Sequence, residues 1–416
     1  MQLTAMRLGA GVIAVLAGGL GAPFWRFWAS ASAANVADGI RAGAFPLIAA
    51  ALTDSPFGVA LVAACQQGAW LVFGLGAGLV ADRRSPARIV ALADVVRVVT
   101  LAALLTVLAL DTASIAMLAG AALVMGAAET FRDTSAHRIL PGLVADKQLE
   151  SANGKLFSTE IVGNEFVGPL IGAALFSVAL LVPVAVDAAV LVTAVMLILT
   201  LPRAATAGVA GDGLPTEHGR LRAELLVGAR WLLRHRRQRA VSCAGAVVCF
   251  ADAGWWSVLV LYSDRTLGVP AAAFGALLAA GAVGGLLGAL GAERLADRFA
   301  VRTLLAASGL ATGLPAVAIA VTDNAYVAGS LLALSSAGFA VWNVVALSTR
   351  QRETPRAVLG RVTAVHRIAL YGSGMVGALT GGWAASTVAL TAPFYVAGLL
   401  ALLAACGLLL LLPQQG

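Results

Sequence analysis

Apolar stretches of about 20 residues recur along this chain, and short polar or glycine-rich connections separate them. A bilayer core about 30 Å thick is crossed by a helix of about 20 apolar residues. The pattern therefore predicts twelve transmembrane helices and an all-α integral membrane fold. The predicted spans lie near 30–52, 57–81, 88–110, 113–131, 156–179, 181–201, 241–262, 273–292, 303–321, 325–347, 362–386 and 391–412.

The second half of the chain repeats the polar landmarks of the first half. Three landmarks recur at a spacing of 214 or 215 residues: Asp38 with Asp252, Asp82–Arg83 with Asp297–Arg298, and Pro141 with Pro355. Many secondary transporters are built from internal repeats of this kind. We therefore expect two six-helix bundles related by a pseudo-two-fold axis along the membrane normal.

The repeat divides the chain into four predicted parts. They are an N-terminal extension (1–29), a first six-helix bundle (30–201), a cytoplasmic linker (202–240) and a second six-helix bundle (241–416). In the linker, apolar residues recur at helical spacing with arginines opposite, which predicts an amphipathic helix at the membrane surface. The extension has the outline of a signal peptide, but an interfacial or loosely ordered extension fits better because the first span needs a cytoplasmic start.

Basic residues fall on alternate connections between the predicted spans. Of the 28 Arg and Lys residues, 24 lie in connections that twelve spans place on one side, and the opposite connections hold only Arg265. Basic loops face the cytoplasm. We therefore expect a multi-pass protein of the bacterial cytoplasmic membrane with both termini cytoplasmic. The net charge of +7 follows from this topology.

Composition limits the classes of function. Charged residues make up 12% of the chain, against roughly 25% in soluble domains, so no basic face remains for nucleic acid. The sequence has no phosphate-binding Gly-Lys-Ser/Thr loop and no metal-ligand spacing, and its four cysteines lie in apolar spans. We expect a monomeric non-enzyme without a cofactor, driven by a proton gradient, whose partners are protons, a small-molecule substrate and the lipid bilayer.

A glycine-rich segment leads into Asp82–Arg83 between the second and third spans. It resembles the signature loop of the major facilitator superfamily, although Ser85 and Pro86 stand where that loop commonly has Gly and Arg. The resemblance implies a latch, in which the aspartate accepts hydrogen bonds from helix-end amides and from an arginine in one conformation of the transport cycle. The latch candidates are Gly78, Asp82, Arg83, Arg88, Asp94, Arg97, Asp297 and Arg298.

The fifth span carries Gly168, Pro169 and Gly172. This spacing resembles the antiporter motif of exporters in the same superfamily. Glycine and proline together permit a kink and close packing, which predicts a gate, although any membrane helix can carry Gly-Pro. With Phe24–Trp25–Arg26–Phe27–Trp28 and Ala128–Glu129–Thr130, the chain resembles the enterobactin-exporter-like and drug:proton antiporter branch.

Ionisable and polar residues inside the spans indicate the transport pathway, because their burial is costly. The proton-coupling candidates are Asp38, Arg41, Asp252, Glu129 and Glu165. Asp38 leads because it lies near the middle of the first span, one turn from Arg41, with a purely structural pair as the alternative. The substrate-cavity candidates are Asn35, Asn164, Trp255, Trp256, Trp342, Asn343 and Tyr371. Trp255 and Trp256 alternatively form an interfacial belt, and His366 is expected at the surface or a helix end.

These features together predict a secondary active transporter. It would export a small organic molecule (a drug, siderophore or other natural product) by proton antiport and alternating access. An importer or facilitator on the same fold, or a non-transporting membrane sensor, are the alternatives.

Overall fold

The computed structural model describes residues 19–202 and 218–411, and these residues are almost entirely helical. The first half contains α2 (Ala22–Leu52), α3 (Pro56–Arg83), α4 (Pro86–Ala109), α5 (Ile115–Ala136), η1 (Leu140–Gly142), η2 (Asp146–Gln148), α6 (Leu149–Glu160), η3 (Ile161–Val167), α7 (Gly168–Val178) and α8 (Val182–Leu199). The second half contains α10 (His218–Arg234), α11 (Arg236–Trp256), α12 (Leu259–Arg265), α13 (Ala271–Arg298), α14 (Val301–Ile319), α15 (Ala325–Glu353), α16 (Arg356–Thr387) and α17 (Ala392–Leu411). Most of the predicted extension and part of the predicted linker lie outside the described residues.

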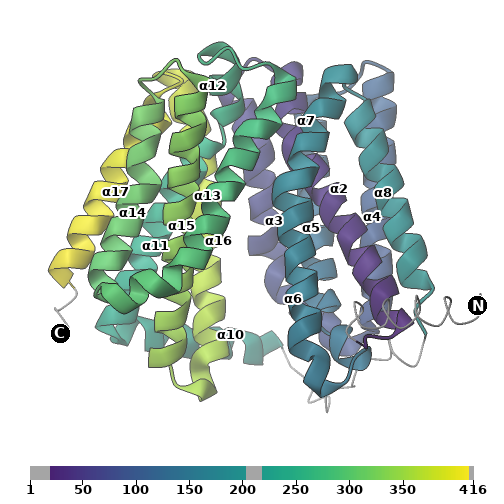
Figure 1. Cartoon of the computed structure of the whole chain (residues 1–416), viewed down its shortest axis with the longest axis horizontal. Coiled ribbons are helices and arrows are strands. Elements are labelled where there is room, and N and C mark those ends of the chain that lie inside the picture. Colours follow the sequence, from purple (N-terminus) through teal and green to yellow (C-terminus); the bar gives the residue numbers. More distant parts are fainter. Residues whose placement is uncertain (1–18, 203–217, 412–416) are drawn as a thin grey trace, which may run out of the picture.

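The helices form two groups that stand side by side, α2–α8 and α11–α17 (Figure 1). In the described part of the chain, ten segments are long and apolar enough to cross a membrane. The 31-residue α2 and the 32-residue α16 complete six membrane-length units in each half. The fifth unit joins α6, η3 and α7, and the seventh joins α11 and α12. The structure therefore confirms the all-α membrane fold of two six-helix bundles.

The internal repeat is visible in the helices themselves. α3 and α13 each have 28 residues, and Asp82 and Asp297 are the penultimate residues of these two helices. Asp38 and Asp252 lie on the first helices of the two halves, α2 and α11. The three landmarks therefore occupy matching places, as Pro141 and Pro355 both follow the fourth helix of their half.

The first span begins earlier than predicted. α2 starts at Ala22, inside the predicted extension, rather than near residue 30. Phe24 and Phe27 are buried in a cluster with Val90 and Ile139, and this packing continues the helix beyond its most apolar section. Hydropathy locates the part of a helix that lies in lipid, whereas side-chain packing sets where the helix ends.

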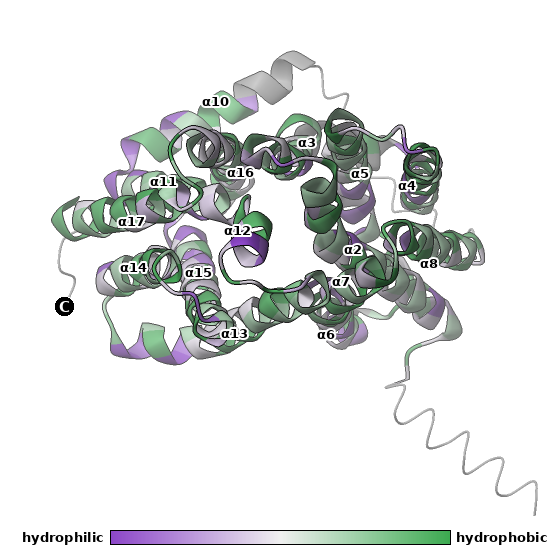
Figure 2. Ribbon diagram, turned by 90° about the horizontal axis from the view of Figure 1, so that it is seen from above, coloured by the Kyte–Doolittle hydropathy of each residue, from purple (hydrophilic) through white to green (hydrophobic). Residues whose placement is uncertain are grey.

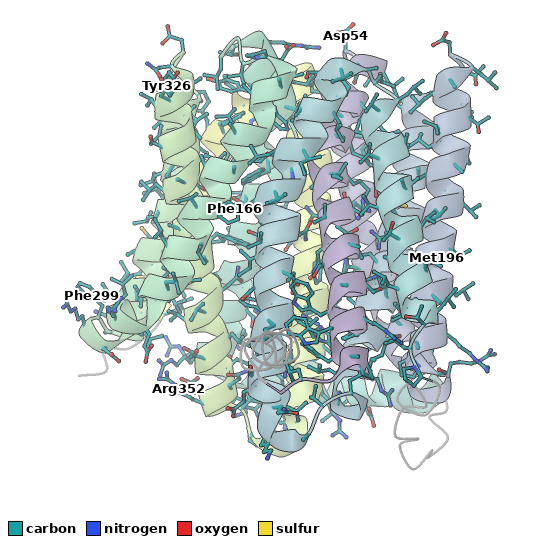
Figure 3. All side chains as sticks on the ribbon, turned by 45° about the vertical axis from the view of Figure 1, so that its right-hand side comes forward. Asp54, Phe166, Met196, Phe299, Tyr326 and Arg352 are labelled. Carbon is teal, nitrogen blue, oxygen red and sulfur yellow. The ribbon has the colours of Figure 1, made fainter. Side chains whose placement is uncertain are left out.

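The molecule has two ends, which α10 and α12 mark (Figure 1). Asp54 and Tyr326 lie at the α12 end, and Arg352 lies at the α10 end (Figure 3). Between these ends large apolar side chains point outward, such as Met196, which is 64% exposed. This outer surface has the apolar character that a lipid bilayer requires.

The helix α10 confirms the amphipathic linker helix. It lies across the end of the molecule and packs on α16 (Figure 1). A Cβ added to Gly228 would clash with the backbone of Arg361, so glycine permits this close approach. Glu224 adds an ion pair to Arg361 at 3.7 Å. The linker is therefore attached to the second half.

The two halves meet from the α12 end to the middle of the molecule. Arg265 binds Asp54 at 3.0 Å across the halves, and deeper in the molecule Trp70 of α3 stacks on Tyr371 of α16 at 5.6 Å. Trp70 and Tyr371 lie near the midpoints of their helices. From above, the helices form a ring with α12 near its middle (Figure 2).

Candidate functional site

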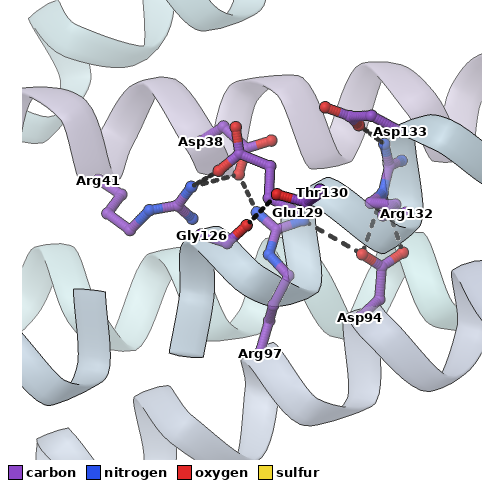
Figure 4. A network of polar contacts seen from close by, with 9 residues as sticks. All are labelled: Asp38, Arg41, Asp94, Arg97, Gly126, Glu129, Thr130, Arg132 and Asp133. Atoms are coloured by element: carbon purple, nitrogen blue, oxygen red, sulfur yellow. Dashed lines mark hydrogen bonds and ion pairs between the residues drawn. The ribbon is translucent and has the colours of Figure 1, made fainter. Parts of the chain in front are cut away.

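A continuous chain of ion pairs runs through the first half (Figure 4). Its members come from α2, α4 and α5; α4 packs on α5, and α2 and α4 both pack on α8. The pairs are Glu129–Arg41 at 2.8 Å, Arg41–Asp38 at 2.9 Å, Asp38–Arg97, Arg97–Asp94 at 3.2 Å, Arg132–Asp94 at 3.0 Å and Arg132–Asp133 at 3.4 Å. We call these seven residues the ion-pair network.

Asp38 lies at the centre of the ion-pair network. It binds Arg41 of its own helix, one turn away, and Arg97 of α4. All three residues are buried. Because a buried charge is costly without a partner, the two arginines stabilise the carboxylate form of Asp38. The predicted Asp38–Arg41 pair is therefore present, as part of a larger assembly.

The ion-pair network extends from the buried centre toward the α10 end. Arg97 and Asp94 are fully buried, whereas the Asp133 side chain is 38% exposed. At the other end of the network, the Glu129 side chain is 17% exposed. Water can therefore reach the two terminal carboxylates more easily than Asp38.

Sequence reasoning missed Arg132 and Asp133 because it ended the fourth span at residue 131. α5 continues to Ala136, and Arg132 comes one turn after Glu129 on this helix. The spacing of Glu129, Arg132 and Asp133 was the available signal, since residues three and four apart share a helix face. The latch candidates Asp94 and Arg97, one turn apart on α4, form an ion pair, and Arg97 also reaches Asp38.

A further carboxylate, Asp187 of α8, lies beside the ion-pair network. It is buried, and both of its carboxylate oxygens are without a hydrogen-bond partner. Arg41 and Arg97 are the cations that interact with it electrostatically. Counting Asp187, five carboxylates share three arginines. This excess of acidic groups leaves room for bound protons, because a proton neutralises a carboxylate that has no cation.

The second half does not repeat this arrangement. Asp252 of α11 is half-buried, and no ion pair joins it to another residue in the described part of the chain. The position that corresponds to Arg41 by the 214-residue spacing holds Trp255. The two halves therefore share a fold but differ in charge.

The predicted gate residues lie where three helices meet. η3 is a π-helix that leads into Gly168 and Pro169, and π-helical turns are frequent at functional sites. A Cβ added to Gly168 would clash with Gly39 of α2, and one added to Gly275 of α13 would clash with Pro169. This motif therefore joins the two halves toward the α12 end. Its gating role stays a prediction.

We expect Gly168→Ala to destabilise the protein, because the added methyl group has no space beside α2. Overpacking of this kind costs about 1–3 kcal/mol, which lowers the melting temperature of the purified protein. Gly154→Ala is the matched control, because Gly154 on α6 has open space around its Cα. Equal melting temperatures for the two variants would show that α2 and α7 can separate without cost.

The predicted latch residues lie in different parts of the structure. The side chains of Asp82 and Arg83 lie outside the described residues, so their contacts are untested. Asp297, Arg298 and Arg88 are exposed. Gly78 has open space around it. Asp94 and Arg97 belong to the ion-pair network, which places them with the proton-coupling candidates.

Two of the predicted substrate-cavity residues are fully packed. Trp255 is fully buried and packs on Phe394 at 5.5 Å, and Trp342 is buried against Gly245 and Gly309. These two tryptophans therefore belong to the packed core, a correction to the cavity prediction. A large aromatic side chain inside a span can line a substrate cavity or fill the packed core. Only the packing around the side chain distinguishes these two roles.

The remaining cavity candidates are accessible to different degrees. Tyr371 is half-buried against Trp70 at the contact between the halves. Asn343 and Glu165 are exposed. The half-buried candidates are Asn35, Asn164 and Trp256.

Residues 20–415 match the model of a family described as transmembrane secretion effectors, within the major facilitator superfamily. The chain belongs to this family. It is therefore a major facilitator superfamily transporter, and the predicted superfamily is confirmed. No curated protein matches the chain.

Solved transporter structures share this fold at low sequence identity. A point mutant of the nucleoside transporter NupG has 13% identity and a TM-score of 0.74, over 94% of this transporter and 100% of the other chain. A bacterial homologue of the iron transporter ferroportin, in its inward-facing state, has 16% identity and a TM-score of 0.72, over 93% and 98%. A bacterial homologue of the human lysosomal transporter Spinster, inward-facing and occupied, has 16% identity and a TM-score of 0.72, over 93% and 95%.

Proposed function

We propose that this transporter exports a small organic molecule by proton antiport and alternating access. The ion-pair network carries the proposal, because it places Asp38 between arginines of two helices in a buried site with surplus carboxylates. The secretion named in the family description and the resemblance to the drug:proton antiporter branch support the direction of export.

The proposed coupling uses competition for Asp38. When Arg41 and Arg97 both contact Asp38, its carboxylate is charged and well compensated. When a conformational change breaks one contact, a buried carboxylate gains from binding a proton, because desolvation disfavours its charged form. We expect the Asp38–Arg41 contact to differ between the two access states for this reason. Proton binding and substrate binding would then favour different states.

The arrangement of the halves fits the loading step of export. The contacts between the halves lie toward the α12 end and the middle. The basic connections and α10 lie at the other end, which we propose to be cytoplasmic. In that orientation, these contacts join the two halves on the outer side of the membrane. A molecule destined for export would enter from the cytoplasmic side.

Everted membrane vesicles test the proposed function. Respiration acidifies their interior, and an acridine dye reports the pH gradient by fluorescence quenching. We expect a transported compound, found in a panel of drugs, siderophores and natural products, to restore fluorescence only in vesicles that contain this transporter. Loss of the compound from preloaded everted vesicles, coupled to proton exit, would instead identify an importer.

We expect Asp82→Asn to lose transport while retaining expression and binding of the compound found in vesicles. Asp82 ends α3 at the α10 end, away from Asp38, so its role would be conformational. Asp111→Asn is the control, because Asp111 is an exposed residue in a turn at the α12 end. Normal transport by a well-expressed Asp82→Asn variant would show that the loop after α3 only connects two helices and has no conformational role.

A further inference from the structure

Three basic side chains gather in the second half, near the α10 end. Arg350 lies in the last turn of α15, and His366 and Arg367 are neighbours on α16. Gln238 of α11 donates a hydrogen bond to the carbonyl of Thr349, next to Arg350, at 3.4 Å. Ser242, one turn along α11, lies 3.0 Å from His366, so α11 brings Arg350 and His366 to neighbouring levels. Like charges that converge in a membrane protein are costly, so their shared position requires an explanation.

Arg350 is a buried cation in the last turn of α15. It is 6% exposed, and its Nε has no hydrogen-bond partner. In the described part of the chain, no ion pair involves Arg350 or Arg367. Glu353, one turn from Arg350, is already bound by Arg237 at 2.9 Å and by Gln238 at 2.8 Å. Burial of an arginine without a counter-ion is destabilising, and an anion beside Arg350 would remove that cost.

This basic cluster lies next to the contact between the halves. Arg367 is exposed and stands one turn from Tyr371 on α16, so the two side chains share a helix face. Tyr371 stacks on Trp70 of the first half. Trp70 lies on α3, which packs on α5, the helix of Glu129, with Phe73 and Phe131 in ring contact at 6.5 Å. The basic cluster therefore lies near the acidic Glu129 end of the ion-pair network, on the other side of the contact.

His366 is buried and makes a side-chain hydrogen bond. The prediction of a surface or helix-end histidine is wrong, because His366 lies inside the bundle. Its Nδ1 is 3.0 Å from the hydroxyl of Ser242 on α11. This contact fixes the ring and leaves Nε2 as the nitrogen that can meet a ligand.

We propose that Arg350, Arg367 and His366 form a subsite for an anionic group of the transported molecule. Arginine suits carboxylate, sulfonate or phosphate, because its planar guanidinium binds their oxygens with charge-assisted hydrogen bonds. The stacked rings of Trp70 and Tyr371 lie beside it and offer a flat apolar surface. The ligand is thus an organic anion with a planar body. The inference rests on the proposed function at one point, because it identifies the bound anion with the transported molecule.

Equilibrium dialysis of the purified full chain tests the subsite with two probes of one shape. The probes are 2-naphthoate, an anion, and 2-naphthamide, its neutral counterpart. We expect saturable naphthoate binding at least about tenfold tighter than naphthamide binding, as a charge-assisted contact provides. Arg350→Gln and Arg367→Gln should each weaken naphthoate binding by about tenfold and leave naphthamide unchanged. Arg352→Gln should change neither, because Arg352 is exposed on the same helix.

Equal affinity of the wild-type protein for the two probes, or no saturable naphthoate binding, overturns the proposal. Unchanged naphthoate binding by Arg367→Gln also overturns the proposal. Because Arg367 is exposed, this variant keeps the test decisive if Arg350→Gln does not give a monodisperse protein. Dialysis involves no gradient, so failure of proton-driven export leaves its result intact. Conversely, loss of naphthoate binding would leave proton antiport of another compound possible.

Discussion

Asp38→Asn is expected to abolish efflux driven by a pH gradient while leaving gradient-independent exchange intact. Asparagine keeps the size of the side chain and can still accept a hydrogen bond from Arg97, but it binds and releases no proton. The substrate pathway would therefore still alternate between the two sides, without coupling. The measurement is efflux and counterflow of the compound identified in vesicles, in proteoliposomes with and without an imposed gradient.

The matched control for this experiment is Asp323→Asn, because Asp323 is exposed in a turn at the α12 end. It should retain both efflux and exchange. Efflux that still follows the gradient in Asp38→Asn would place the coupling site elsewhere. The next variants would then replace Asp187, which has no partner for its carboxylate oxygens, followed by Asp252, Glu129 and Glu165.

The sequence predicted the fold well because the signal was repeated many times. Twelve apolar stretches and three landmarks at one spacing all indicate the same two-bundle membrane architecture. Helix ends were less predictable, as the early start of α2 at Ala22 shows. Its first turns are held by packing of Phe24 and Phe27, and hydropathy contains no information on that packing.

The candidate site was predictable only where contacts are local. Asp38 and Arg41 are three residues apart, so helical spacing alone brings them together. The contact of Asp38 with Arg97 joins residues 59 apart, and it depends on how α2 and α4 are arranged around α8, on which both pack. His366 illustrates the same limit, since its burial depends on the packing of α16 on α11, where it meets Ser242.

The glycines explain why the helices of the first half approach so closely. Gly39 and Gly43 of α2 face Gly168 and Pro169 of the fifth span, and a Cβ at either glycine of α2 would clash with backbone atoms. Close packing of small residues is a common means of helix association in membranes. It holds α2 in place next to the gate motif, so a movement of α7 would also move the helix that carries Asp38.

Arg97→Gln is expected to cause the largest loss of stability among single substitutions in the ion-pair network. Arg97 binds both Asp38 and Asp94, and its side chain is fully buried. Removal of one partner from a buried ion pair costs about 3–5 kcal/mol, because it leaves a charge uncompensated. The melting temperature of the purified protein should fall accordingly. Arg294→Gln, at an exposed position of α13, should leave it unchanged.

A second substitution separates charge from packing. Asp38→Asn combined with Arg97→Gln removes a carboxylate together with its cation, so the double variant should be more stable than Arg97→Gln alone. The coupling energy from the double-mutant cycle should lie at the upper end of the 0.5–3 kcal/mol seen for contacting residues. If the two losses simply add, Arg97 stabilises the first half through its packing and Asp38 carries no charge in the resting protein. Proton coupling would then begin from a protonated Asp38, with Arg97 held by Asp94.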